Sequence, residues 1–381
     1  MGAPDPGASS FLEQFVDPWY SSLADPSGSQ EQALRGLLSG YAKTDYGKEF
    51  GAGEIGGILD FQRRFPIANY RSLSPFIERV KRGEYSALLP EPVARWVMTR
   101  GTTGRPKMVP ATEAHLALIL SLGARAIINF ALKRDPEVLE KSVLNLNFPS
   151  EVGTMRTERG EETYGYSSGS YAKFHPSLGP TALVPKQEEI DSLGGGIGTK
   201  DWERRFELVY QSAKDKPVGS VMGVTPVITG FARYLRGMHG ILPKQLWRMR
   251  GLFCTSVAKI QTKYAPMLRH QYGESAPLVE MYTATEGVFA QQIDDRPYVS
   301  PNYDGFLFEV KDRRGRVKLL HEMEQHDWGR IIISGPLFPR YDIGDMVESV
   351  GKNCFRVFGR AGRATTLEHL LFELLTGGFH F

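Results

Sequence analysis

The feature that most constrains the fold is a Thr/Gly-rich segment that separates a short apolar run from a long helical pattern. The segment reads Thr99-Arg100-Gly101-Thr102-Thr103-Gly104-Arg105-Pro106-Lys107. The apolar run covers residues 96–98, and the helical pattern extends over about 112–133. Glycines let backbone N–H groups turn inward, and the hydroxyls and lysine add donors, so the segment predicts a polyphosphate-binding loop. It is not a Walker A loop, because Met108 rather than Ser or Thr follows Lys107. An ordinary flexible turn is the alternative.

Short apolar runs bounded by turn formers recur along the chain and alternate with helical patterns. The predicted strands lie at residues 96–98, 143–148, 183–185, 251–254, 278–282 and 330–334. Helices are predicted within residues 11–57, at 70–82 and at 112–133, and a Gly/Ser/Tyr-rich loop is predicted over 164–171. Strands that alternate with helices indicate an α/β fold with layered sheets and helices.

Composition excludes several classes of protein. The 381 residues carry a net charge of +3, which gives no reason to expect nucleic acid or an anionic membrane as partner. Two cysteines are too few for a disulfide framework, so a cytoplasmic location with buried thiols is expected. The N-terminus lacks the pattern of a signal peptide, and Arg125 interrupts the apolar run from His115 to Leu132, which predicts a buried helix. Residues 1–10 are expected to form a flexible tail.

Two further motifs follow predicted strands. In Met281-Tyr282-Thr283-Ala284-Thr285-Glu286-Gly287, a hydroxyl and a carboxylate stand where they can meet a phosphate and hold Mg²⁺. In Arg340-Tyr341-Asp342-Ile343-Gly344-Asp345, an aspartate behind a glycine turn is suited to accept ribose hydroxyls. Arg360, fifteen residues after Asp345, can pair with phosphate or ribose. The alternatives are a solvated loop for the first motif and a hairpin with surface charges for the second.

In this order and separation, the three motifs resemble those of the acyl-adenylate-forming superfamily. Within it, the chain is most similar to the auxin-responsive acyl acid–amido synthetases of plants and their microbial relatives. The similarity covers residues 30–360 and is weakest over 151–204. It includes the segment Phe61-Gln62-Arg63-Arg64-Phe65-Pro66-Ile67 together with Tyr70 and residues 75–80 and 83–84 upstream of the loop.

The resemblance implies a role for each matching position. The residues expected to hold the β- and γ-phosphates are Thr99, Gly101, Thr102, Thr103 and Gly104, with Lys107 nearby. Tyr282 and Thr283 would flank the adenine, Thr285 would contact the α-phosphate, and Asp345 would bind the ribose beside Arg360. Thr255 and Ser256 would line the adenine and acyl pocket, with residues 222–226 in the acyl wall. The expected catalytic group is Thr103, Lys107, Glu286 and Arg360, and Glu286 is the expected metal ligand.

The implied fold is α/β, namely the large N-terminal domain of an adenylate-forming enzyme, over residues 11–360. The implied function is activation of a carboxylic acid by ATP and Mg²⁺ as an acyl-adenylate, with acyl transfer to an amine or amino acid. Two alternatives stay open. One is an acyl-CoA ligase of the phenylacetate type, with CoA as acceptor. The other is an ATP-binding partner subunit that does not catalyse alone.

The chain departs from the family pattern at two places. The family's loop usually opens with two serines, whereas this chain has Thr99 and Arg100. After Arg360 the family continues into a small mobile domain of about a hundred residues, which contributes a lysine. Here residues 361–381 predict only a hinge remnant and one helix at 366–375, and no lysine follows Lys352. The expectation is that the small domain is absent and that adenylation is slow unless Arg100, Arg105 or a separate partner chain compensates. A truncated chain, a naturally short enzyme and one half of a two-chain system are the open alternatives.

Two other motifs resemble a metal site and a hydrolase site, but their sequence context favours ordinary loops. His321 and His326 are five residues apart, a spacing that does not place them on one helix face for a metal. Residues 165–169 fit the G-x-S-x-G spacing of a hydrolase nucleophile elbow, which requires a strand before the serine and a helix after it. The charged stretch upstream and the absence of a helical pattern downstream favour a loop here.

Overall fold

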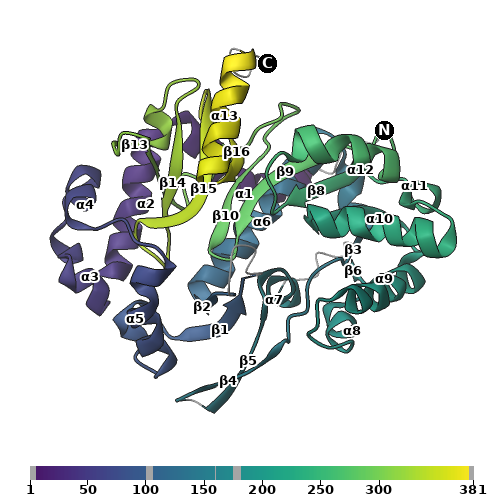
Figure 1. Ribbon diagram of the computed structural model, residues 1–381, viewed down its shortest axis with the longest axis horizontal. Helices are drawn as coiled ribbons and strands as arrows, with labels where there is room; N and C mark the ends of the chain where they lie inside the picture. Colours follow the sequence, from purple (N-terminus) through teal and green to yellow (C-terminus); the bar gives the residue numbers. More distant parts are fainter. Residues whose placement is uncertain (1–5, 100–105, 159, 175–181, 377–381) are drawn as a thin grey trace.

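Three β-sheets and the helices around them make up the fold (Figure 1). The computed structural model describes residues 6–99, 106–158, 160–174 and 182–376. The predicted loop residues Arg100, Gly101, Thr102, Thr103, Gly104 and Arg105 therefore lie outside the described residues.

The largest sheet has seven strands in the order β11-β10-β9-β8-β7-β3-β6. Its strands are β3 Ser142–Leu144, β6 Leu183–Val184, β7 Val218–Val224, β8 Gly251–Thr255, β9 Leu278–Ala284, β10 Gly287–Gln291 and β11 Ser300–Pro301. The five neighbouring strands β6, β3, β7, β8 and β9 run parallel, whereas β10 and β11 are antiparallel to their neighbours. All five residues of β8 are buried, as expected for a parallel strand that is covered on both faces.

Helices cover both faces of this sheet. Phe253 of β8 makes an edge-to-face contact with Phe130 of α6 (Glu113–Lys133), with ring centroids 5.8 Å apart. On the other face lie α10 (Thr225–His239) and α12 (Ala265–Tyr272), which are joined by a 2.7 Å hydrogen bond from the Tyr272 hydroxyl to the Ile228 carbonyl. The remaining helices on that side are α8 (Gln187–Asp191), α9 (Thr199–Ala213) and α11 (Pro243–Leu246) (Figure 1).

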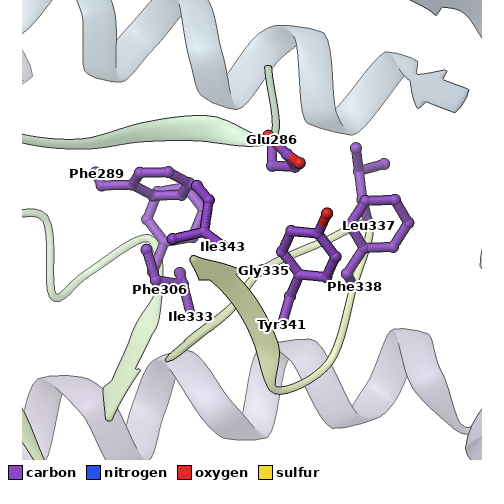
Figure 2. A pocket seen from close by; sticks show the side chains of 9 residues that line it. All are labelled: Glu286, Phe289, Phe306, Ile333, Gly335, Leu337, Phe338, Tyr341 and Ile343. Carbon is purple, nitrogen blue, oxygen red and sulfur yellow. The ribbon is translucent and has the colours of Figure 1, made fainter. Parts of the chain in front are cut away.

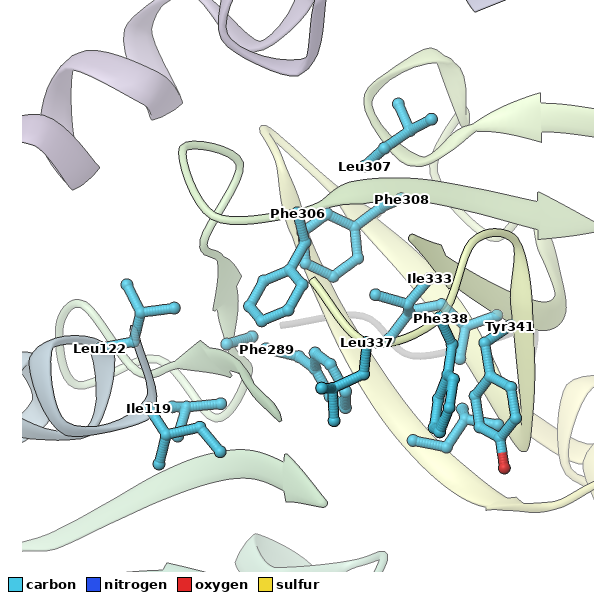
Figure 3. Packing of buried hydrophobic residues seen from close by; sticks show 14 of the residues in the cluster. Ile119, Leu122, Phe289, Phe306, Leu307, Phe308, Ile333, Leu337, Phe338 and Tyr341 are labelled. Atoms are coloured by element: carbon cyan, nitrogen blue, oxygen red, sulfur yellow. The ribbon is translucent and has the colours of Figure 1, made fainter. Parts of the chain in front are cut away.

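The prediction of a buried helix at 112–133 is confirmed by α6. In the described part of the chain, α6 is the one helix long and apolar enough to cross a membrane, but much of it is core. Ile119 and Leu122 of α6 face the same cluster of apolar side chains as Phe289 and Phe306 (Figure 3). Arg125 is accommodated because its guanidinium bonds to Asp304 at 2.8 Å.

The two smaller sheets flank this core. One has the order β2-β1-β5-β4 and is formed by β1 Val93–Met98, β2 Met108–Thr112, β4 Gly153–Thr157 and β5 Gly160–Tyr166. The other is wholly antiparallel, in the order β13-β12-β14-β15-β16, and is formed by β12 Leu307–Lys311, β13 Val317–Leu319, β14 Trp328–Ser334, β15 Tyr341–Gly351 and β16 Cys354–Arg360. The chain then continues into α13 (Arg363–Thr376), which overlaps the helix predicted at 366–375.

Residues 164–171, predicted as a loop, instead complete β5 and begin α7 (Ser167–Phe174). The prediction was wrong because β5 is an irregularly exposed strand whose charged residues lack an apolar alternation. Pairing with β1 in parallel and β4 in antiparallel register supplies the order that the local sequence does not. A strand and a helix therefore do flank Ser167. Residues 6–10 of the predicted N-terminal tail lie in α1, which begins at Pro6.

The N-terminal helices are α1 Pro6–Ala24, α2 Pro26–Tyr41, α3 Asp45–Glu49, α4 Ile58–Arg64 and α5 Tyr70–Lys81. A capping box between Asn69 and Ser72 fixes the start of α5. Its buried residues are Leu73, Ile77 and Val80, at the spacing of one helix face.

A buried arginine joins these helices to the start of β15. The Arg340 guanidinium donates to both carboxylate oxygens of Glu309, at 2.7 and 3.0 Å, and to the carbonyls of Gln62 and Phe65, both at 2.7 Å. Glu309 is fully buried and Arg340 is 4% exposed. The Ala68 N–H donates to the Arg340 carbonyl at 3.0 Å, which continues the same junction along the backbone.

Arg340→Met should lower the free energy of unfolding by about 3–5 kcal/mol, because it leaves the Glu309 carboxylate buried without its cation. Urea unfolding of the variant and the parent measures this. The double variant Arg340→Met/Glu309→Leu should recover part of the loss, since it removes the uncompensated charge. A single variant within about 0.5 kcal/mol of the parent would contradict this account.

Candidate functional site

The predicted motifs meet where three sheets approach one another. Met98, at the end of β1, pairs in parallel register with Tyr166, so that Thr99 and Ser167 leave the sheet on the same edge. The β9–β10 turn contributes Thr285 and Glu286, and β15 contributes Tyr341 and Asp345. A Cβ on Gly287 would lie 2.6 Å from the Phe289 ring and 2.8 Å from the Phe306 ring, so the close packing behind this turn requires a glycine.

The base of the predicted phosphate loop is a backbone-paired hairpin. The Thr99 N–H donates to the Lys107 carbonyl, and the Lys107 N–H donates to the Thr99 hydroxyl, both at 2.9 Å. This pairing extends the antiparallel register of β1 and β2. The strand β2, which separates the loop from α6, was not predicted from the sequence. The loop's two ends are thereby held together, which fixes the positions of Thr99 and Lys107.

Glu286 and Lys107 are linked through Tyr341. The Lys107 ammonium donates to the Tyr341 hydroxyl at 3.3 Å, and that hydroxyl faces the Glu286 carboxylate (Figure 2). Figure 2 shows Glu286 and the Tyr341 hydroxyl facing each other at the rim of an otherwise apolar pocket. Burial raises the pKa of Glu286, and the nearby Lys107 opposes that rise. A half-buried carboxylate of this kind is stabilised when a cation binds to it.

Asp345 is held by two partners on either side. The Tyr282 hydroxyl donates to Oδ2 at 2.9 Å, and Arg360 Nη1 donates to Oδ1 at 2.7 Å. Arg360 lies directly opposite Asp345 in the β15–β16 register. Burial raises the pKa of Asp345, and Arg360 opposes it. Each oxygen of an ionised carboxylate accepts more than one hydrogen bond, so Asp345 retains acceptor capacity for ligand hydroxyls.

The predicted adenine-side residues are brought together by adjacent parallel strands. The Thr255 and Thr283 hydroxyls are 2.5 Å apart across β8 and β9. Thr225, at the start of α10, donates to the Thr255 carbonyl at 2.9 Å and so ties the 222–226 segment to this group. Ser256, directly after β8, has a φ of 75°, a conformation that is uncommon outside glycine and typical of constrained functional loops.

Two residues of α7 that were not predicted as site residues bond to Thr285, and a histidine of α6 packs against one of them. The Tyr171 hydroxyl of α7 donates to the Thr285 carbonyl at 2.7 Å, and the Thr285 hydroxyl donates to Ser167 at 3.3 Å. The His115 ring of α6 lies edge-on to Tyr171. These positions are more than a hundred residues from Thr285, so local sequence carries no signal of the contact. The Gly-x-Ser-x-Gly match did mark Ser167, but for a different chemistry.

In the described part of the chain, the site residues fall into two groups, and contacts join the members of each group. Lys107 bonds to Tyr341, which faces Glu286 (Figure 2), and Tyr282 and Arg360 both bond to Asp345. The two groups influence each other electrostatically, because Asp345 raises the pKa of Glu286. The site therefore combines cationic, carboxylate and hydroxyl groups at one edge of the fold.

Comparison with known proteins assigns the family. Residues 19–192 match the GH3 family N-terminal domain. The chain belongs to the GH3 family. It is 35% identical over 366 residues to a probable indole-3-acetic acid-amido synthetase, GH3.7, of Oryza sativa subsp. japonica. That alignment covers 77% of this chain and 58% of the rice protein, so the GH3 chain described here spans less than two thirds of its relative.

Solved structures agree on the fold. The GH3 acyl acid amido synthetase AtGH3.15, solved with 2,4-DB, matches 95% of this chain and 72% of its own at a TM-score of 0.74 and 15% identity. A 2-hydroxyisobutyryl-CoA ligase matches 86% of this chain and 68% of its own at a TM-score of 0.60 and 14% identity. The fold is therefore that of the large N-terminal domain of adenylate-forming enzymes, as predicted. None of these comparisons supports a separate chain that supplies a further domain.

His115 should make the fold acid-sensitive. Burial lowers its pKa from 6.5 to about 4, so between these pH values the unfolded chain binds a proton that the folded chain does not. The free energy of unfolding should therefore fall by up to about 3 kcal/mol as pH drops from 6.5 to 4. Urea unfolding across this range should show a smaller fall for His115→Gln. Parallel pH profiles for the two proteins would refute the assignment.

Proposed function

We propose that this GH3 chain binds Mg-ATP and activates a carboxylic acid as an acyl-adenylate, for transfer to the amine of an amino acid. The observation that carries the proposal is the convergence of Lys107, Glu286, Asp345 and Arg360, which are up to about 250 residues apart in sequence, at one edge of the sheets. These groups match the successive parts of a nucleoside triphosphate: cations for phosphate, a carboxylate for metal, and acceptors for ribose.

The proposed roles follow from the positions of the described side chains and, for the loop residues, from the sequence motif alone. Asp345, oriented by Tyr282 and Arg360, would accept the ribose hydroxyls. Thr255, Ser256 and Thr283 would lie along the adenine, and the loop residues Gly101, Thr102, Thr103 and Gly104, with Thr99, would hold the phosphates. Thr285 would meet the α-phosphate.

The residues present fit a magnesium ion. Mg²⁺ in nucleotide sites is held by one or two carboxylates together with substrate phosphates. Glu286 is a half-buried carboxylate that lines the pocket and faces the Tyr341 hydroxyl (Figure 2). When bound, the ion would neutralise phosphate charge. Glu286 would hold it, and Tyr341 would orient Glu286.

The chemistry needs no covalent intermediate on the protein. A carboxylate oxygen of the acid attacks the α-phosphorus, the bond to the bridging oxygen breaks, and pyrophosphate leaves with the electron pair. Lys107 and the loop N–H groups stabilise the charge that accumulates on the leaving phosphates. An amine nitrogen then attacks the acyl carbon, loses a proton, and displaces AMP to leave an amide.

The amide-forming reaction is favoured over thioester formation by the names of the sequence relatives. These include an indole-3-acetic acid-amido synthetase of rice and a jasmonoyl–L-amino acid synthetase of Nicotiana attenuata. The CoA ligase similarity, at 14% identity, concerns the fold alone. Both acceptor classes nevertheless enter the test.

Nucleotide product analysis tests the proposal. The chain is incubated with Mg-ATP and pooled carboxylic acids, with hydroxylamine, amino acids or CoA as acceptor. Acid-dependent AMP and pyrophosphate are expected, with amide in preference to thioester. Asp345→Asn should lower kcat/KM about 10- to 100-fold, because it removes a charged acceptor from the ribose. Asp60→Asn, at a surface pair with Arg64, serves as the matched control and should leave the rate unchanged.

The products distinguish the outcomes. ADP in place of AMP would overturn adenylation in favour of phosphoryl transfer. Thioester alone would support the CoA-ligase alternative. ATP binding without any product would support the non-catalytic alternative.

A further inference from the structure

The Lys107 ammonium lies between two tyrosine rings that come from distant parts of the chain. It is 5.5 Å from the ring centre of Tyr70, at the start of α5, and 5.8 Å from that of Tyr341, at the start of β15. Both distances are within the range of cation–π attraction. Lysine has a flexible four-carbon stem, so this surrounding restricts a side chain that would otherwise sample many rotamers.

Tyr70 also fixes the backbone beside Lys107. Its hydroxyl accepts a hydrogen bond from the Met108 N–H and donates one to the Met108 carbonyl, both at 3.0 Å. Tyr70 is itself placed by the capping box that begins α5 with Asn69. Thr99 therefore holds the backbone of the lysine, Tyr70 holds the backbone of the next residue, and the two rings lie beside the ammonium.

Tyr341 connects Lys107 to Glu286 through one hydroxyl. Its oxygen accepts from Lys107, and the hydroxyl faces the Glu286 carboxylate (Figure 2). Tyr341 is 3% exposed and directly follows Arg340, whose guanidinium is locked by Glu309. The backbone that carries Tyr341 is thus held in place by the Arg340–Glu309 pair.

We propose that Tyr70 and Tyr341 are positioning residues that set Lys107 and Glu286 at a fixed separation for the polyphosphate and its metal. The proposal rests on the nucleotide-binding function above. Its physical basis is preorganisation, because a cation and a carboxylate that are already placed lose less conformational entropy when the ligand binds. Tyr341 couples the two groups, and Tyr70 holds the lysine end.

A double-mutant cycle tests whether Tyr341 acts through Lys107. Affinities for a non-hydrolysable Mg-ATP analogue are measured by calorimetry for the parent, Tyr341→Phe, Lys107→Met and the double variant. Tyr341→Phe keeps the ring that packs against Phe338 and removes only the bridging hydroxyl. It should weaken binding about 10-fold, and the double variant should bind no more weakly than Lys107→Met alone. Tyr70→Phe should show the same non-additivity with Lys107→Met.

Tyr303→Phe is the matched control, since the Tyr303 hydroxyl is buried in the same core without a hydrogen-bond partner in the described part of the chain. It should leave affinity unchanged. Additive losses in the cycle, or parental affinity in Tyr341→Phe, would overturn the positioning role. Failure of the parent to bind the analogue would overturn the nucleotide-binding function and this proposal together, whereas binding without turnover leaves the cycle decisive.

Discussion

The Arg340–Glu309 pair lies where the N-terminal helices meet the antiparallel sheet, and the candidate site depends on it. Arg340 directly precedes Tyr341, and Asp345 lies four residues further along β15. By bonding to Glu309 of β12 and to the carbonyls of Gln62 and Phe65, the guanidinium fixes the strand that carries both site residues. A buried ion pair of this kind contributes less to stability than to defining one arrangement, because desolvation offsets much of the attraction.

Burial of charge is also the central feature of the site. Glu286 and Asp345 both have raised pKa values, with burial as the leading cause in each case. Lys107 and Arg360 compensate in part, and hydroxyls of Tyr341 and Tyr282 supply further hydrogen bonds. Carboxylates that are incompletely stabilised in the free protein gain most from a bound cation or from ligand hydroxyls. Burial of these carboxylates therefore lowers the stability of the free protein and favours the ligand binding that we propose.

The family match and the structural match cover different lengths of the chain. The family match covers residues 19–192, which include the predicted phosphate loop and α7 but not Glu286, Asp345 or Arg360. The structural match extends over 95% of the chain at 15% identity, so the arrangement of sheets is retained where the sequence has diverged. Contacts such as that of Tyr171 with Thr285 show how the two regions form one site.

The sequence by itself determined the elements whose signal is local: the apolar strands that became β8, β9 and β14, the capped helices α5 and α6, and the motifs around Glu286 and Asp345. It did not determine β5 and α7, whose order comes from pairing with β1 and from packing beneath Thr285. Nor could it place Tyr70 and Tyr341 on either side of Lys107, because residues more than two hundred positions apart meet only through the junction that Arg340 holds. Periodicity and turn chemistry act over a few residues, whereas the separation of charged groups in the site is set by how the sheets pack.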